Sequence, residues 1–379
     1  MSAHAAYPLV HVTGDARERG LAHGKEAAER VRRSVELYGA IFRHYADWDW
    51  DEVTRHALRF EQPIREAHPG FLDELRGIAE GSGLAYEDIL AINVRTEVMF
   101  SAVARSAAVE CSSFAATAEA TLDGHVLVGQ NWDWKPHTTE TVIVLDVERD
   151  DGPDYVTVVE AGLLAKTGMN SAGIGLTTNA LISSDDQGEP GMPYHVILRA
   201  ILDAENLPQA LDAVTRHPRS SAANYLIAHR DGLAVDVEAA PGDFSRVWLV
   251  FPEHGLLGHT NHYVCSTPGI KDVTRWYAPD SPFRLARLEG LLDGARGRIE
   301  PRHFEETLRD HVSFPLSVCK HDDPPSLPEY EHTVTVASVV YDLTTGQMRL
   351  ADGQPCTREY RTLDYSHWAA SPTGVAANR

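Results

Sequence analysis

The sequence predicts an α+β protein in which β-sheets pack on each other and are covered by helices. Segments of helical and of strand character occur in groups, in the order helices, strands, helices, strands, helices, strands. Most of the predicted strands are joined by short turns of the hairpin type. A parallel, doubly wound sheet needs strict alternation of single strands and helices, which this chain lacks.

The first hundred residues are predicted to be helical. The stretch 18–48 is rich in Ala, Glu, Arg and Leu, with apolar residues three to four positions apart. Three further helical stretches are expected near 51–67, 71–83 and 84–101. The third of the four ends in glycines that suit a helix C-cap.

Strand character begins at Cys111. Residues 111–134 alternate apolar and polar positions around the turn signal Asp123-Gly124, which predicts a β-hairpin. Further strands are expected within 141–149, 155–181, 223–241 and 245–263, and a final hairpin within 332–352. Helices are expected within 194–217, near Pro282 to Leu292 and near Pro301 to His311.

Composition excludes several classes of partner. The net charge is −21, with 55 acidic against 34 basic residues, so nucleic acid and anionic membranes would be repelled. No apolar run reaches 18 residues and the N-terminus lacks a secretory pattern, so we expect a cytoplasmic protein without a membrane span. The four cysteines are far apart and form no CxxC, so we expect neither a disulfide framework nor a structural zinc site. No cofactor is expected.

Cys111 is the first candidate for chemistry. It lies at the predicted boundary between helix and strand, where a thiol can be a nucleophile or merely a small buried group. In GQNWDW, Asn131 and Asp133 alternate with Trp132 and Trp134, so a strand would place the polar pair on one face. Asn and Asp are poor strand formers, which indicates a demand other than folding.

The segment HTNH, residues 259–262, offers two interpretations. Asn261 could donate a hydrogen bond from its side-chain amide to an oxyanion. Alternatively His259 and His262 could bind a metal together with Asp322, and His321 and Asp323 could add ligands. Strand positions three apart face opposite sides of a sheet, which disfavours the metal.

Together these segments resemble the isopenicillin-N acyltransferase-like family of N-terminal-nucleophile (Ntn) hydrolases. Each block alone is a weak signal, but seven in the family's order are specific. The blocks are ERGLAHG, CSSFAA, GQNWDW, EAGLLAKTGMNSAGIGLTTNAL, GMPYHVILRAIL, HTNH and FPLSVCK.

The resemblance implies a four-layer αββα sandwich of two antiparallel sheets. It also implies synthesis as a precursor that is cut between Glu110 and Cys111. Residues 1–110 would form a helical small chain and 111–379 the large chain, together one structural domain. The penicillin-pathway member of the family has Gly before its nucleophile, whereas this chain has Glu110.

The resemblance further assigns roles to individual residues. Cys111 would be the nucleophile and its freed α-amine the base, Asn261 the oxyanion donor, and Asp133 the acid beside the amine. Residues expected to bind substrate are Glu160, Asn179, Lys320 and Trp134. Lys320 stands where the penicillin-pathway member has Arg, which keeps the charge but loses the bidentate fork.

The leading hypothesis is therefore a self-processing cysteine hydrolase that cleaves a small N-acyl or aminoacyl amide. Its partners would be a small-molecule amide or acyl donor and its own two cleaved chains. A second hypothesis is transfer of the acyl group from a CoA thioester or amide to an amine. A metal-dependent hydrolase and an unprocessed binding protein on the same fold are the third and fourth.

Overall fold

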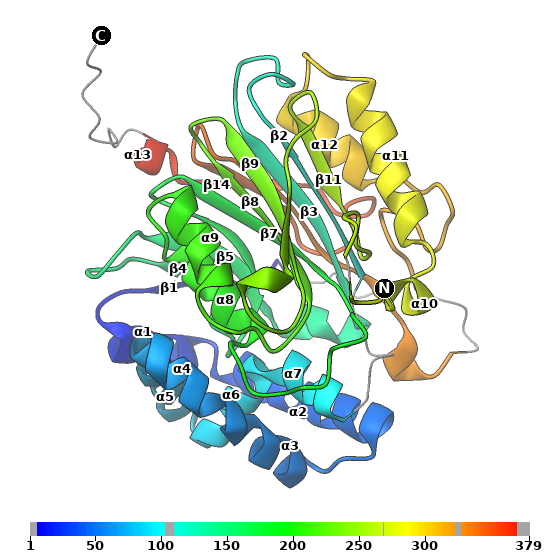
Figure 1. Cartoon of the computed structure of the whole chain (residues 1–379). Coiled ribbons are helices and arrows are strands. Elements are labelled where there is room, and N and C mark those ends of the chain that lie inside the picture. The colour runs from blue at the N-terminus through cyan, green and yellow to red at the C-terminus, as the bar shows by residue number, and fades with distance from the viewer. Residues whose placement is uncertain (1–5, 103–109, 268, 323–326, 370–379) are drawn as a thin grey trace.

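The computed structural model describes residues 6–102, 110–267, 269–322 and 327–369, apart from the side chain of residue 110. Two β-sheets lie face to face, and helices cover both outer faces, as Figure 1 shows. This arrangement confirms the predicted α+β class and the four-layer αββα order.

Within the described residues, the larger sheet has eight strands, and the pair at one edge is parallel. All neighbouring pairs are antiparallel except the first, in which β1 runs parallel to β4. The prediction of two antiparallel sheets is wrong at this pair, and the N-terminal segment is not wholly helical. In sheet order, the strands are β1 (Leu9–Val12), β4 (Val142–Val147), β5 (Tyr155–Glu160), β6 (Thr167–Asn170), β7 (Ile174–Ala180), β8 (Ala223–His229), β9 (Leu233–Ala239) and β10 (Val247–Val250).

The smaller sheet, as far as the chain is described, has six strands, and all its neighbouring pairs are antiparallel. The predicted hairpin around Asp123-Gly124 is present as β2 and β3, and Gly124 has φ +76°, a conformation that favours glycine. The predicted last hairpin is also present, but a further strand follows it. In sheet order, the strands are β11 (Leu256–His259), β2 (Glu110–Ala116), β3 (Leu127–Trp134), β12 (Val334–Asp342), β13 (Gln347–Ala351) and β14 (Arg361–Asp364).

Each outer face of the sandwich carries a pair of helices. α8 (Tyr194–Leu202) and α9 (Leu207–Thr215) pack on the larger sheet, whereas α11 (Ser281–Asp293) and α12 (Pro301–Leu308) pack on the smaller one. The two pairs stand on opposite sides of the strands in Figure 1. The single helix predicted over 194–217 is thus two helices, with Asn206 capping the second.

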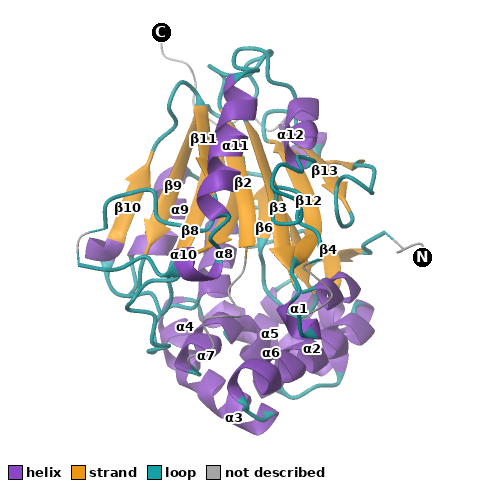
Figure 2. Cartoon of the chain, turned by 90° about the vertical axis from the view of Figure 1, so that its right-hand side faces the viewer, coloured by secondary structure: helices purple, strands orange, loops and turns teal. Residues whose placement is uncertain are grey.

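The helices before Cys111 gather at one end of the sandwich, below the strands in Figure 2. α1 and α5 cross so closely that a Cβ at Gly20 would lie 2.1 Å from the carbonyl oxygen of Glu74. This contact explains the glycines of ERGLAHG as a packing requirement. The helices are α1 (Ala16–Glu26), α2 (Ala28–Ala46), α3 (Trp50–Ala57), α4 (Glu61–Ala67), α5 (Pro69–Ser82), α6 (Tyr86–Asn93) and α7 (Arg95–Ser101); the short α10 (Thr274–Tyr277) and α13 (Ser366–Ala369) lie elsewhere.

The side chains of strand β3 alternate between the core and the outer helical layer. Trp132 and Trp134 belong to the core between the two sheets, while Asn131 donates to main-chain carbonyls of the outer helical layer, 2.8 Å away at Leu308. The predicted split of polar and indole faces is therefore confirmed. Among the described residues, we find no helix with the length and apolar character needed to cross a membrane.

Candidate functional site

Cys111 is the second residue of β2. It pairs with Trp132 of β3, is only 1% exposed, and is part of the core between the sheets. Strand β11 flanks β2 on its other side and ends two residues before Asn261. The strand order therefore brings together the HTNH segment and the predicted nucleophile.

Both main-chain polar groups of Cys111 are bound by buried side chains. Its N–H donates to Oδ1 of Asn261 at 2.7 Å, and its carbonyl oxygen accepts from Nη1 of Arg284 at 2.7 Å. Arg284 also donates from Nη2 to Oδ1 of Asn261 at 3.0 Å, and Nδ2 of Asn261 donates to the carbonyl of Ala180 at 3.0 Å. Asn261 is thus an acceptor toward the Cys111 nitrogen, a contact that the sequence did not predict.

Arg284 is a residue that the sequence did not single out. It projects from α11, is 2% exposed, and forms an ion pair with Asp280 at 2.6 Å. Asp280 in turn accepts from Nζ of Lys320 at 3.2 Å. Lys320 is therefore connected to the Cys111 carbonyl through Asp280 and Arg284.

Asp133 faces the outer helical layer, on the opposite side of the sheet from the indoles. Its Oδ1 accepts from Oγ1 of Thr335 at 2.6 Å, and that hydroxyl accepts from the main-chain N–H of Lys320 at 2.9 Å. Burial raises the pKa of Asp133 to about 8, opposed by the Arg284 cation. In the uncut chain this carboxyl group is therefore protonated near neutral pH.

Replacing Asp133 by Asn is expected to stabilise the uncut chain more at about pH 7.5 than at about pH 5. Between the ordinary carboxyl pKa and the folded value of about 8, the folded chain holds a proton that the unfolded chain has released. Wild-type stability therefore falls across this range, by up to about a few kcal/mol for a buried acid. Asn cannot ionise and still accepts from Thr335.

The measurement is the unfolding temperature of Asp133→Asn at both pH values, in the Cys111→Ala background so that all samples are one chain. Asp293→Asn, which removes a carboxylate that is 63% exposed, is the control. An Asp133→Asn effect that does not change with pH would contradict the assignment.

The thiol of Cys111 is electrostatically tuned by a buried lysine, which the sequence also did not single out. Burial raises the Cys111 pKa to about 11, and Lys166 is the largest influence that lowers it. The Lys166 ammonium lies 4.6 Å from the centroid of the Trp132 ring. Burial, followed by the Arg95 cation, lowers the pKa of Lys166 to about 8.

Glu160 and Trp134 belong to one buried network. Arg95 donates to Glu160 at 2.7 Å, the Tyr38 hydroxyl donates to the other carboxylate oxygen, and the Trp134 indole N–H donates to that hydroxyl at 3.0 Å. Both oxygens of Glu160 are thus bound by side chains of the N-terminal helices.

Asn179 of β7 links the larger sheet to the smaller one through Ser113 of β2. Its Oδ1 accepts from Oγ of Ser113 at 2.8 Å and from Nδ2 of Asn224 at 3.2 Å, and its Nδ2 donates to the His259 carbonyl at 3.4 Å. Since Ser113 is two residues after Cys111 on the same strand, Asn179 lies near the thiol side of β2.

The alternative metal ligands His259, His262 and Asp322 do not gather, and His321 lies in a different group, with His311, Cys319 and Cys356. Nε2 of His259 lies 2.9 Å from a carboxylate oxygen of Glu238, and Nδ1 of His262 lies 2.8 Å from Oγ of Ser281. In the described parts of the chain, His259, His262 and Asp322 form no group of converging ligand atoms. Asp323 lies outside the described residues.

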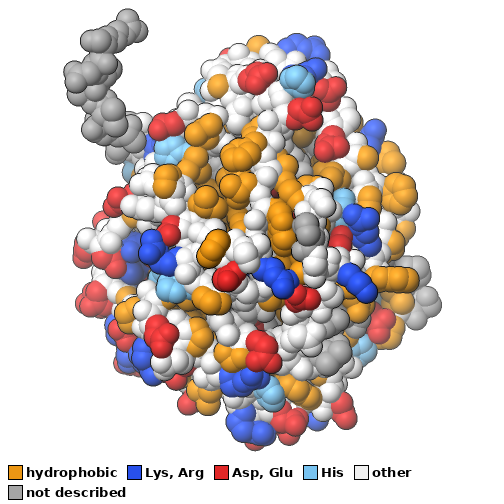
Figure 3. All heavy atoms as spheres, in the orientation of Figure 1, with side chains coloured by type: hydrophobic (Ala, Val, Ile, Leu, Met, Phe, Trp, Pro, Cys, Tyr) orange, Lys and Arg blue, Asp and Glu red, His pale blue; other side chains and the backbone are white. Residues whose placement is uncertain are grey.

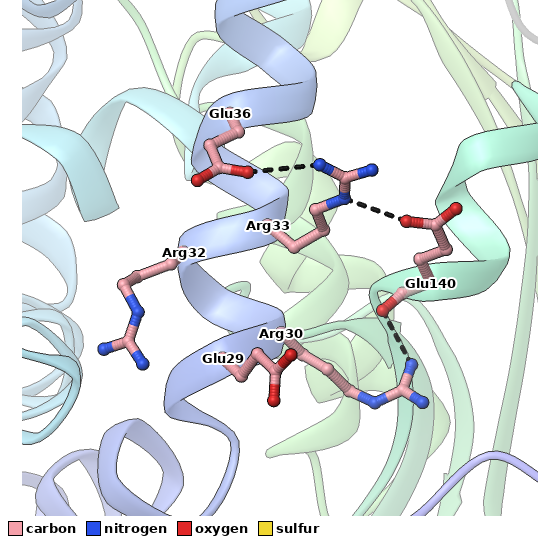
Figure 4. A pocket seen from close by; sticks show the side chains of 6 residues that line it. All are labelled: Glu29, Arg30, Arg32, Arg33, Glu36 and Glu140. Atoms are coloured by element: carbon pink, nitrogen blue, oxygen red, sulfur yellow. Dashed lines mark hydrogen bonds and ion pairs between the residues drawn. The ribbon is translucent and has the colours of Figure 1, made fainter.

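Two surface hollows are separate from these residues. One, of about 500 Å³, lies beside α2, and Figure 4 shows its arginines and glutamates. Arg33 of α2 binds Glu140 at 2.9 Å there, which joins the segments before and after Cys111. The other, of about 430 Å³, lies where β10 and β11 end the two sheets and is lined by exposed Leu249 and Phe251. Apolar side chains gather near the centre of the face in Figure 3.

A four-layer αββα sandwich is the architecture of the Ntn hydrolase class. Comparison with known proteins gives the family: a profile described as acyl-coenzyme A:6-aminopenicillanic acid acyl-transferase matches residues 120–356. The chain belongs to this family. Because the match starts at residue 120, it does not itself cover Cys111.

Individual proteins similar to this chain include both sequences and solved structures. The chain is 27% identical over 315 residues to the acyl-coenzyme A:6-aminopenicillanic-acid-acyltransferase 40 kDa form of Emericella nidulans, covering 82% of this chain and 85% of that protein. It is 24% identical over 344 residues to an uncharacterized protein of Archaeoglobus fulgidus, covering 79% of this chain and 57% of that protein. A mutant of conjugated bile acid hydrolase from Clostridium perfringens aligns with a TM-score of 0.47 and 12% identity, covering 69% of this chain and 95% of that one.

Proposed function

We propose that the chain is a cysteine Ntn hydrolase that cuts itself before Cys111 and then cleaves the amide bond of a small N-acyl or aminoacyl amine. One observation carries the proposal. The N–H and the carbonyl oxygen of a buried cysteine are both held by buried side chains, those of Asn261 and Arg284, each at 2.7 Å. Such fixation suits a residue whose own peptide nitrogen takes part in the chemistry.

The self-cleavage we propose begins when Sγ of Cys111 attacks the carbonyl carbon of Glu110. A carbon–sulfur bond forms, the peptide C–N bond breaks, and the thiol proton passes to the leaving nitrogen of Cys111. Water then hydrolyses the resulting thioester and releases the carboxyl group of Glu110. The contact between Asn261 and the Cys111 nitrogen supports this step, because it fixes the leaving atom throughout.

After the cut, Cys111 carries both the nucleophile and a base. An α-amine has an ordinary pKa near 8, so a large fraction is neutral at neutral pH and can accept the thiol proton. If Asn261 accepts a hydrogen bond from one amine N–H, the lone pair of the amine nitrogen stays available for the thiol proton. Lys166 favours the thiolate, since its charge lowers the Cys111 pKa.

The substrate roles of Glu160, Asn179, Lys320 and Trp134 stay predictions. Asn179 has the most direct support, because it is bonded to Ser113 on the strand of Cys111. Glu160 and Trp134 both bind the Tyr38 hydroxyl of the N-terminal helices. We expect Glu160 and Trp134 to support a substrate-binding wall beside Cys111. Lys320 would act on the site through its ion pair with Asp280.

The two pieces are proposed to remain one domain after cleavage. Strand β1 comes from the small piece and pairs with β4 of the large one. Arg33 binds Glu140 and Arg95 binds Glu160 across the same division. Cytoplasmic location is also part of the proposal.

Intact mass of the purified wild-type protein tests self-cleavage. Because 110 of the 379 residues precede Cys111, the 41.7 kDa chain is expected to give pieces of about 12 and 30 kDa. The larger piece should begin with Cys111 on N-terminal sequencing, and both should elute together in size exclusion. A wild type that stays uncut after prolonged incubation would overturn self-processing.

Acyl transfer is the second candidate function, because the Emericella nidulans relative is named an acyltransferase. Hydrolase and transferase share the acyl-enzyme and differ in whether water or an amine resolves it. Wild-type protein given an acyl donor with increasing amounts of 6-aminopenicillanic acid or another small amine would separate them. A hydrolase releases free acid throughout, whereas a transferase forms a new amide at the expense of the acid.

A further inference from the structure

Two cysteines and two histidines outside the proposed active site come together on the smaller-sheet side of the molecule. One ligand atom from each of His311, Cys319, His321 and Cys356 lies within 4.8 Å of all the others. His311 follows α12, Cys319 and His321 precede β12, and Cys356 lies between β13 and β14. We propose that these four side chains bind one zinc ion.

The three distances from His321 to the other ligand atoms are close to those of tetrahedral coordination. Zinc bonds of about 2.0–2.1 Å to nitrogen and 2.3 Å to sulfur place two nitrogens about 3.3 Å apart and a nitrogen and a sulfur about 3.6 Å apart. Nε2 of His311 lies 3.0 Å from Nε2 of His321. The latter atom lies 3.7 Å from Sγ of Cys319 and 3.4 Å from Sγ of Cys356.

Ordinary hydrogen bonding explains this convergence poorly. Nε2 of His321 has three neighbours, yet a ring nitrogen offers either one N–H or one lone pair. One of the three contacts can be a good hydrogen bond, so the other two contacts of this nitrogen are not explained by its own hydrogen bonding. A cation at the centre of the four atoms uses a lone pair or a thiolate from each.

The surroundings support a structural ion. Nδ1 of His321, its other ring nitrogen, lies 3.2 Å from the Gln354 amide nitrogen, a donor, so binding through Nε2 requires Gln354 to turn its amide oxygen toward the Nδ1–H. Two cysteines and two histidines make a closed set of four, as in structural zinc sites, without a coordination position for substrate. His311 is the exposed member and leaves a route for the ion.

The position of the site suggests what the ion does. Lys320 stands between two of the ligands, and its main-chain N–H binds Thr335, which binds Asp133. A metal bound to Cys319 and His321 would therefore fix the segment that holds Lys320, whose ammonium group pairs with Asp280 beside Arg284. Metal binding itself does not depend on the proposed catalytic activity.

The metal content of the untagged full-length protein tests the proposal. The protein is purified without chelator, dialysed against Zn²⁺ and then dialysed against metal-free buffer. We expect about one zinc per chain by mass spectrometry. Cys356→Ser and His311→Ala should each lose most of it, and His311→Ala, which changes an exposed residue, covers the case in which Cys356→Ser does not fold. Replacement by Co²⁺ should give visible bands of tetrahedral cobalt and thiolate charge transfer in the near ultraviolet.

Cys265→Ser is the matched control, because this cysteine lies outside the cluster, and it should keep the ion. Cys111→Ala should also keep it, so loss of catalysis and loss of metal are distinguishable. A wild type without zinc that does not take up added Zn²⁺ would overturn the proposal. So would a Cys319–Cys356 disulfide, seen by peptide mapping as the state of the protein purified without oxidant.

Discussion

Replacing Cys111 by alanine is expected to leave one uncut chain of 41.7 kDa and to remove amide-cleaving activity. Alanine lacks the sulfur that both proposed reactions need, while the strand and its main-chain contacts with Asn261 and Arg284 stay available. Loss of a nucleophile typically lowers turnover by more than about 10³-fold. Intact mass and hydrolysis of a panel of N-acyl amines measure the two effects separately.

Cys265→Ala provides the comparison for this variant, because Cys265 is a free thiol that is not buried. It should be cut and should turn over as the wild type does. An uncut Cys111→Ala chain with normal activity would favour a metal-dependent hydrolase over a thiol nucleophile. A cut Cys111→Ala chain would place the processing nucleophile elsewhere.

Local patterns in the sequence were sufficient for much of this architecture. The hairpin of β2 and β3 follows from strict alternation and the Asp123-Gly124 turn, and these features depend only on neighbouring residues. The split of Asn131 and Asp133 from the two tryptophans follows from the period of a strand. The order of the layers came from the family resemblance, because the packing of sheets and helices is a long-range property.

Residues whose importance comes from long-range contacts could not be predicted. Arg284 reaches Cys111 across 173 positions, and nothing in its helix distinguishes it from neighbouring arginines. Lys166 sits in a glycine-rich segment, and its position over Trp132 depends on the packing of two sheets. Cys319 and Cys356 looked unrelated because 36 residues separate them from each other along the chain. The parallel strand β1 is only four residues long and precedes a strong helical pattern.

Asn261 is the residue for which the structure most changes the expected chemistry. The sequence predicted a donor to the oxyanion, and the structure adds an acceptor contact from its Oδ1 to the Cys111 nitrogen at 2.7 Å. Arg284 donates to the same oxygen at 3.0 Å, which fixes the amide orientation with oxygen toward the cysteine. The nitrogen end of Asn261 is thereby turned away from the Cys111 N–H and donates to the Ala180 carbonyl at 3.0 Å, so its role as an oxyanion donor stays a prediction.

Asn261→Ala is therefore expected to slow both self-cleavage and turnover, and Asn261→Asp should separate its two roles. Losing one oxyanion donor costs about 2.7–4 kcal/mol, or about 10²–10³ in rate. The aspartate keeps an acceptor for the Cys111 nitrogen but loses the donor, so turnover should fall as in the alanine variant. Its carboxylate would also favour the charged α-amine and shift the rise of the pH–rate profile to higher pH.

Asn170→Ala is the control, because Asn170 is equally buried and binds only main-chain groups near Leu202 and Ala204. Normal turnover in Asn261→Asp would show that the acceptor contact, and not an oxyanion donor, is what catalysis requires.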